Sequence, residues 1–179
     1  GLAGEVDGLF GRALLGQIAG AACDLGTEFP GEGRAAFGVD VGQDQACAAF
    51  GGSNEMLFEK DGSINVKPLK IDSERLVALN RYLLLFFTGQ SRRAEEVAKS
   101  YTTNLESKQA TLDRVHELVD EAQVVLVGSQ PLEAIGALMD ENWQLKRSLS
   151  DKVSNASIDD IYEIAKKAGA LGGKLTGAG

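Results

Sequence analysis

The residues best suited to chemistry stand in a glycine-rich segment that covers residues 172–179 and reads GGKLTGAG. Glycine lets the backbone adopt positive φ and approach an anion closely, while Thr176 supplies a hydroxyl and Lys174 a cation. The segment therefore predicts phosphate chemistry. Its spacing matches neither the Walker loop GxxxxGK[ST] nor a GxGxxG that follows a strand. A plain helix C-cap and turn would account for the first glycines, but not for the run through Gly179.

A second segment with chemical potential covers residues 41–52 and reads VGQDQACAAFGG. Phosphoryl transfer to a hydroxyl often uses a carboxylate that takes the proton of the acceptor. Asp44 is the candidate for that carboxylate. A lone aspartate of this kind is more often a turn residue bonded to nearby backbone amides, so its neighbours must decide between the two interpretations.

A third segment, residues 83–92, reads LLLFFTGQSR and leads into a predicted helix. Ser91 and Arg92 stand at the start of that helix, where free amides, a hydroxyl and a guanidinium group together suit a phosphorylated sugar. Ordinary helix capping beside solvated arginines is the alternative.

Taken together, these segments resemble the GHMP kinases, a superfamily that contains galactokinase and the homoserine, mevalonate and phosphomevalonate kinases. Residues 172–179 look like the third motif of the family, GGKxTGAGxGG, and residues 42–52 look like the GxQDQxAAxxGG segment that carries its catalytic aspartate. Residues 83–92 are similar to the sugar kinase branch that phosphorylates heptose 7-phosphate at the anomeric carbon. The resemblance is nearly continuous from residue 41 to residue 179.

The resemblance implies an ATP- and Mg²⁺-dependent kinase that phosphorylates the C1 hydroxyl of D-glycero-D-manno-heptose 7-phosphate. It implies a catalytic role for Asp44. The implied substrate-binding residues are Gln43, Gln45, Ser91, Arg92 and Lys174. Those implied near the nucleotide phosphates are Thr176, Gly177, Ala178 and Gly179. Glu32, twelve positions before Asp44, is the candidate magnesium ligand, although it stands between two glycines rather than in the helical context usual for the family.

The sequence also departs from the family pattern. The PxxxGLGSSA loop that should hold the nucleotide phosphates is absent from residues 1–40, and the third motif stops at Gly179. We therefore expect the chain as printed to bind ATP poorly. Two alternatives stay open: another sugar kinase of the fucose or galactose type, and a non-catalytic ligand-binding protein that retains the fold.

Composition sets wider bounds. With 179 residues, 44% of them hydrophobic, the chain can bury one substantial core, or one domain and part of another. A net charge of -8 argues against a general nucleic-acid surface. No apolar run approaches the roughly 20 residues that span a bilayer, and no leader pattern opens the chain. The sequence therefore predicts a cytoplasmic protein with ATP and a sugar phosphate as partners, and leaves a homodimer open.

Hydrophobic periodicity predicts the elements that must position these residues. Helices are expected over residues 7–23, 91–101, 105–126, 131–149 and 157–167, with Pro131 in a first turn, Ser157 as an N-cap and Gly169 after the last helix. Trp143 is expected to pack inside its helix bundle. A hairpin is expected over residues 56–66. The apolar run 82–87 suits a strand covered on both faces, and a buried helix is the alternative that periodicity alone does not exclude.

This order of elements predicts an α+β fold, with helices packed on one side of a sheet. The family resemblance makes the expectation more specific. Residues 1–71 would be the end of a ribosomal-protein-S5-like N-terminal domain that binds nucleotide and carries the catalytic residue. Residues 72–179 would be a ferredoxin-like C-terminal domain.

Overall fold

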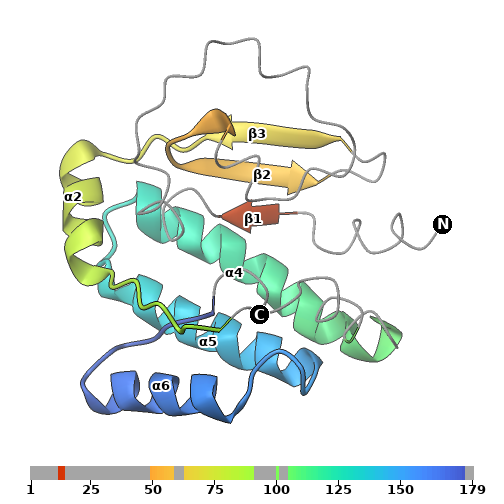
Figure 1. Cartoon of the computed structure of the whole chain (residues 1–179). Helices are drawn as coiled ribbons and strands as arrows, with labels where there is room; N and C mark the ends of the chain where they lie inside the picture. Colours follow the sequence, from red (N-terminus) through yellow and green to blue (C-terminus); the bar gives the residue numbers. More distant parts are fainter. Residues whose placement is uncertain (1–11, 15–48, 59–62, 91–99, 101–104, 176–179) are drawn as a thin grey trace. The chain divides into compact units, whose positions relative to one another are not determined.

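The computed structural model describes residues 12–14, 49–58, 63–90, 100 and 105–175 (Figure 1). The chain divides into two compact units, Gly1–Ser73 and Glu74–Gly179, and each is described by itself. The helix predicted over residues 7–23 is wrong where the structure describes it, because Arg12–Leu14 form a strand that pairs with another segment of the unit. The helix predicted over residues 91–101 falls almost entirely outside the described residues. The assignment of residues 1–71 and 72–179 to two functional domains stays a prediction.

The first unit contains a three-stranded antiparallel sheet in the order β1-β2-β3. Its strands are β1 (Arg12–Leu14), β2 (Asn54–Phe58) and β3 (Ile64–Pro68). Met56 pairs with Val66 on one side and with Ala13 on the other, and its side chain is completely buried. The hairpin predicted over residues 56–66 is confirmed, and the turn predicted at Asp61-Gly62 lies outside the described residues.

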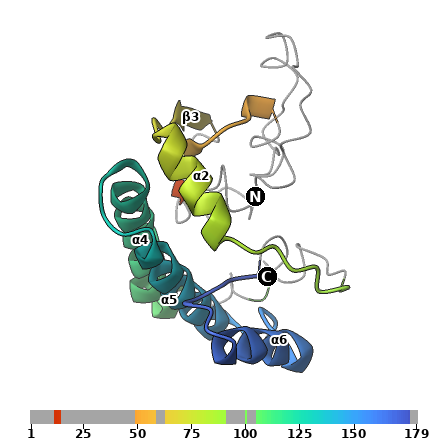
Figure 2. The same ribbon diagram turned by 90° about the vertical axis from the view of Figure 1, so that its left-hand side faces the viewer.

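The second unit is helical in its described part, with α4 and α5 side by side (Figures 1 and 2). The elements are α2 (Ser73–Tyr82), a short 3-10 turn η2 (Leu105–Lys108), α4 (Gln109–Val127), α5 (Glu133–Leu149) and α6 (Ala156–Lys167). The helices predicted over 105–126, 131–149 and 157–167 are confirmed with small changes at their ends. Pro131, predicted in a first turn, instead precedes Leu132, the N-cap of α5. No strand occurs in the described residues of this unit, so its ferredoxin-like sheet stays a prediction.

Apolar side chains at helical spacing form the core of the second unit. Trp143 on α5 is only 1% exposed, which confirms its predicted packing role. Burial of each large aliphatic or aromatic side chain contributes roughly 1.5–3 kcal/mol. The buried apolar residues are Leu79, Leu112, Leu118, Val125, Leu126, Leu132, Ile135, Trp143, Leu149, Val153 and Ile158.

Helix α2 reaches α4 through one arginine. The Arg75 guanidinium donates to the carbonyl oxygens of Val125, Leu126 and Gln130, at the end of α4 and just beyond it. The last carbonyls of a helix lack partners inside the helix and carry its negative dipole end, so a guanidinium suits them. Arg75 thereby holds the start of α2 on the C-terminal end of α4.

The strand predicted over residues 82–87 is wrong. Helix α2 continues to Tyr82, and residues 83–90 have no regular secondary structure. Leu84 is 91% exposed and Phe87 is 87% exposed, instead of being covered on both faces. A strand needs a neighbour for its backbone hydrogen bonds, and no described strand lies in this unit to provide one.

Helix α6 has a well-defined cap at each end. Asn155, not Ser157, is the N-cap: its backbone is extended and its side-chain oxygen accepts from the amide of Ile158 at 3.1 Å. At the other end Gly169 has φ +99° and donates to Lys166 O, while Ala170 donates to Ala165 O. These two bonds form a Schellman motif, and they confirm the predicted role of Gly169.

Asn155→Ala should lower the free energy of unfolding by about 1 kcal/mol, because an orphan amide of the first turn would lose its acceptor. Ser157→Ala is the matched control, because Ser157 lies inside the helix and is exposed. Urea denaturation of both variants measures the difference. Equal losses in the two variants would contradict the assignment of Asn155 as the cap.

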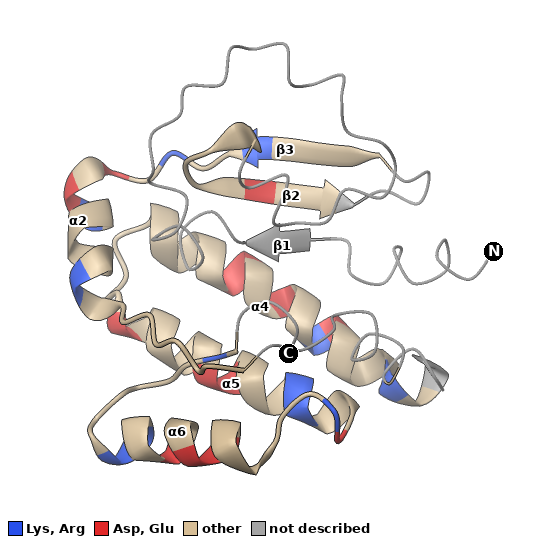
Figure 3. Cartoon of the chain, in the orientation of Figure 1, with Lys and Arg blue, Asp and Glu red and all other residues tan. Residues whose placement is uncertain are grey.

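Charged side chains are interspersed along all the helices of the second unit (Figure 3). In α6 the basic residues gather in the last turn, where Lys166 and Lys167 complement the helix dipole. Among the described helices, none combines the length and the apolar character that a bilayer crossing requires.

Candidate functional site

Of the predicted site residues, only Lys174 belongs to the described part of the chain. The other predicted positions lie outside it, and their roles stay predictions: Glu32, Gln43, Asp44, Gln45, Ser91, Arg92, Thr176, Gly177, Ala178 and Gly179. The described part of the site therefore consists of the residues next to two of the motifs, VGQDQACAAFGG and GGKLTGAG.

The motif that contains Asp44 ends in a tight change of direction before β2. Phe50 has a helical backbone, and Gly51 and Gly52 both have positive φ, +61° and +62°. Only glycine adopts such a conformation without strain. The side-chain amide of Asn54 donates to Gly51 O at 2.5 Å and holds the turn. The fold therefore explains why both positions are glycine: the chain passes there from a helical turn into a buried strand.

The glycine-rich segment is held in place by α5 and α6 before it begins. Nζ of Lys166 on α6 donates to the carbonyl oxygen of Leu171 at 2.7 Å. The same ammonium lies 3.5 Å from Oδ1 of Asp140 on α5. This ion pair is not accompanied by a hydrogen bond, and Oδ1 of Asp140 is buried without one. Lys166 therefore links the two helices and the backbone of the segment through a single ammonium group.

Gly172 then passes directly against α5. A Cβ atom at this position would lie 2.0 Å from Gly136 O and 2.8 Å from the backbone nitrogen of Asp140. A Cβ atom at Gly136 would lie 2.6 Å from the Cβ of Leu171. Two glycines that are 36 positions apart in the sequence thus allow the segment and the helix to touch backbone to backbone.

This contact corrects the expectation that positive φ explains the glycines of the segment. Among the described residues, neither Gly172 nor Gly173 has positive φ. Gly172 is required by the close approach of α5, because any side chain would collide with the helix backbone. Gly177 and Gly179, for which the same expectation was made, lie outside the described residues.

Leu175 and Lys174 complete the described part of the segment. Leu175 packs against the buried cluster of Trp143, Val153 and Ile158. Lys174, next to it, is half-buried, and burial lowers the pKa of its ammonium below the ordinary value. Lys146, one turn after Trp143 on α5, has its pKa lowered to about 8, mainly by burial and further by the charge of Lys174. The fold thus brings two half-buried cations together.

Sequence reasoning missed the residues of α5 and α6 that hold this segment: Gly136, Asp140, Lys146 and Lys166. One signal was available, because a glycine inside a helix costs about 1 kcal/mol relative to alanine and often marks a close contact. Gly136 is such a glycine. The two lysines and the aspartate resemble ordinary charged residues of amphipathic helices, so their sequence pattern carried no signal.

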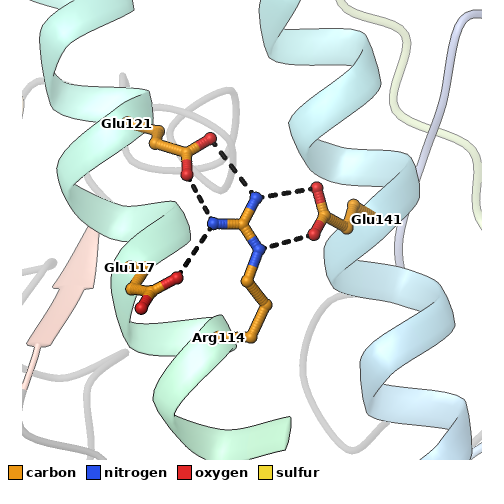
Figure 4. Close-up of polar contacts among 4 residues, drawn as sticks. All are labelled: Arg114, Glu117, Glu121 and Glu141. Carbon is orange, nitrogen blue, oxygen red and sulfur yellow. Dashed lines mark hydrogen bonds and ion pairs between the residues drawn. The ribbon is translucent and has the colours of Figure 1, made fainter.

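A separate ionic cluster joins α4 to α5 (Figure 4). The guanidinium of Arg114 on α4 donates to both carboxylate oxygens of Glu141 on α5, at 2.6 and 3.0 Å. It also binds Glu117 and Glu121 on its own helix. Hydrogen bonds from Arg114 lower the pKa of Glu141, against the opposing effect of desolvation. The cluster links α4 to α5 through ion pairs, and all four side chains remain partly exposed to solvent.

Glu141→Gln should lower the melting temperature by about 2 °C or less at neutral pH, because partly exposed ion pairs contribute little. A carboxylate whose folded pKa is lowered stabilises the fold above its unfolded pKa, near 4.5, and loses this effect as the pH falls through the folded value. The difference between the two proteins should therefore vanish in acid and shrink in 1 M salt. Glu163→Gln, at an exposed position of α6, is the control. A difference that persists in acid would contradict the ionic origin.

Within the part of the chain that the structure describes, no group of three or more His, Cys, Asp or Glu side chains could hold a metal ion. The predicted magnesium ligand Glu32 lies outside that part. The described part of the site therefore comprises the residues that hold the glycine-rich segment, together with Lys146 and Lys174.

Comparison with known proteins places this geometry in a family. The family model described as GHMP kinases C terminal matches residues 118–179, which run from the middle of α4 through the glycine-rich segment. The match thus includes α5, α6 and the contact between Gly136 and Gly172.

Similar proteins are kinases. The chain is 29% identical over 143 residues to the D-glycero-alpha-D-manno-heptose 7-phosphate kinase of Campylobacter jejuni. The aligned residues make up 79% of this chain and 42% of that protein. This chain is 29% identical over 150 residues to the mevalonate kinase of Thermococcus sibiricus, covering 79% and 41%. It is 28% identical over 120 residues to the bifunctional fucokinase/GDP-fucose pyrophosphorylase of Arabidopsis thaliana, covering 65% and 11%.

The chain spans less than half the length of these relatives. The residues matched by the family model contain the helices that hold the segment GGKLTGAG. Residues 118–179 therefore match the C-terminal domain of the GHMP kinases.

Proposed function

We propose that this chain is part of an ATP-dependent kinase that transfers the γ-phosphoryl group to an alcohol. The observation that carries the proposal is the agreement between the C-terminal family match and the motif VGQDQACAAFGG, which stands far upstream of the matched residues. The described support of the glycine-rich segment fits this function, because phosphoryl transfer depends mainly on positioning and charge stabilisation.

The proposed acceptor is the C1 hydroxyl of D-glycero-D-manno-heptose 7-phosphate. Support comes from the segment TGQSR at residues 88–92 and from the heptose 7-phosphate kinase among the relatives. Ser91 and Arg92 would bind the sugar phosphate, and Gln43 and Gln45 would contact the sugar near Asp44. A mevalonate kinase has the same identity to this chain, so mevalonate is the alternative acceptor to be tested.

In the proposed reaction the acceptor oxygen attacks the γ-phosphorus while the bond to the bridging oxygen of ADP breaks. Asp44 receives the proton of the acceptor hydroxyl. Thr176, Gly177, Ala178 and Gly179 would lie along the phosphates, and Lys174 would bind an anionic group of the ligands. Mg²⁺ bound with ATP would supply charge neutralisation at the phosphoryl oxygens, with Glu32 as its proposed protein ligand.

Phosphorus NMR of the natural protein in its full length, with MgATP and one acceptor at a time, tests this function. With heptose 7-phosphate we expect ADP together with a new anomeric phosphate signal. Parallel samples contain mevalonate or fucose. A product from only one of these would keep the kinase and replace the acceptor. If none of the three acceptors is phosphorylated, the protein is not the proposed kinase, and the non-catalytic alternative takes its place.

A further inference from the structure

The backbone at the start of the glycine-rich segment is held by a lysine of α6 rather than by burial. Leu171, which directly precedes the segment, has an exposed side chain. Its carbonyl oxygen accepts a hydrogen bond of 2.7 Å from Nζ of Lys166. A hydrogen bond from a charged donor is roughly twice as strong as one between neutral groups. The ammonium of Lys166 therefore fixes the point at which the chain leaves the cap of α6 and enters the segment.

Two lysines stand in the last turn of α6, but their surroundings differ. Lys167 is exposed, as expected for a lysine that complements the helix dipole. Lys166 is half-buried, and its ammonium lies 3.5 Å from Oδ1 of Asp140 on α5. Among the described residues this buried carboxylate oxygen has no hydrogen-bond partner. Asp140 therefore supplies the counter-charge for the ammonium that holds the carbonyl oxygen of Leu171.

The place that Lys166 fixes is also the place where the segment touches α5. The backbone of Gly172 passes so close to this helix that an added Cβ would lie 2.8 Å from the backbone nitrogen of Asp140. Leu175, at the other end of the described segment, packs against the buried core cluster. Between these two anchors, a Cβ atom added at Gly173 would meet nothing within 4 Å. The described segment is therefore held at both ends and has open space beside its backbone between them.

We propose that Lys166 is a positioning residue for phosphoryl transfer, and that Asp140 holds its ammonium in place. The hydrogen bond to Leu171 O sets where the segment begins, and so sets its distance from the phosphate groups of the ligands. Phosphoryl transfer depends on such positioning, and a displacement of about 1 Å can lower a rate about 100-fold. The proposal rests on the proposed kinase function, and it assigns Lys166 no contact with ATP or with the acceptor.

Lys166→Met tests the proposal in the full-length protein, because methionine keeps an unbranched stem and removes the ammonium. With MgATP and the acceptor that the natural protein phosphorylates, kcat should fall about 10- to 100-fold. Lys167→Met is the matched control at the exposed neighbouring position, and it should leave kcat within about twofold. Steady-state kinetics of the two variants measure the difference. Unchanged kcat in Lys166→Met would overturn the proposal.

A double variant separates the position of the segment from the stability of the fold. Lys166→Met by itself leaves the partly buried carboxylate of Asp140 without its cation, which destabilises the protein. Adding Asp140→Asn removes that charge, so the melting temperature should recover. The value of kcat should stay low, because Leu171 O still lacks its donor. Recovery of kcat together with the melting temperature would show that Lys166 only stabilises the fold, and would overturn the proposal.

A measurement of the contact itself needs no turnover. A Cβ atom at Gly136 would lie 2.6 Å from the Cβ of Leu171, so the α-protons of this glycine and the leucine side chain should give nuclear Overhauser contacts. These contacts should disappear in Lys166→Met and persist in Lys167→Met. If they do so but the natural protein phosphorylates no acceptor, the kinase function fails and Lys166 still positions the segment. If the natural protein is active and Lys166→Met keeps both the contacts and kcat, the positioning role alone fails.

Discussion

Asp44→Asn should lower kcat for phosphoryl transfer by about 10²- to 10⁴-fold, the usual contribution of a positioned general base. Asparagine keeps the size and hydrogen-bonding shape of the side chain but cannot accept the proton of the attacking hydroxyl. The melting temperature and the KM for ATP should change little, because neither depends on that proton. Steady-state kinetics and thermal denaturation of the purified variant measure both effects.

Asp40→Asn provides the matched control for this prediction. Asp40 is also an aspartate, four positions before Asp44, but it stands outside the segment GQDQ that resembles the family motif. Its replacement should leave kcat within about twofold, as expected for a residue without a role in the chemical step. Equal losses of kcat in the two variants, or full activity of Asp44→Asn, would contradict the catalytic assignment.

Gly172→Ala should lower the free energy of unfolding by about 3 kcal/mol, at the upper end of the range for overpacked sites. The added Cβ would lie 2.0 Å from Gly136 O and 2.8 Å from the backbone nitrogen of Asp140. These are backbone atoms of α5, so they cannot turn aside as the end of a flexible side chain would. The segment itself must move away from the helix, which also displaces Lys174 and the residues that follow.

Gly173→Ala is the control, because a Cβ atom there meets nothing within 4 Å and the residue does not have positive φ. Its effect on stability should be within about 0.5 kcal/mol. Urea denaturation of the two variants, followed at Trp143, measures the difference. A loss of similar size at both positions would contradict the contact with α5 as the cause, because the backbone entropy of a Gly→Ala change by itself favours the folded state.

Several features of the second unit could be predicted because their signals are local. The spacing of apolar residues predicts α4, α5 and α6, since a helix makes its hydrogen bonds four residues apart and presents one face to the core. Gly169 could be predicted to follow α6 for the same kind of reason, because a Schellman motif involves only neighbouring residues. The predicted N-cap of α6, Ser157, lies two positions after the observed one, Asn155. Both residue types are good caps, and only the backbone conformation decides between them.

The apolar run 82–87 shows where local signals fail. Its composition suits a strand, but a strand is completed by hydrogen bonds to another segment, and composition cannot supply that partner. In the described structure α2 extends to Tyr82, and residues 84–87 of the run are exposed. The composition therefore predicted a strand whose hydrogen-bonding partner is not among the described residues.

The sequence by itself determined the three long helices, the hairpin, the cap at Gly169 and the motifs that resemble the GHMP kinases. The tertiary structure alone decided why Gly172 is a glycine, which residues hold the segment, and that Lys146 meets Lys174. The physical reason is distance along the chain. Gly136 and Gly172 are 36 positions apart, and Lys146 and Lys174 are 28 apart. Such pairs meet only when α6 packs on Trp143 and returns the chain to α5, and a local pattern of residue types does not encode that return.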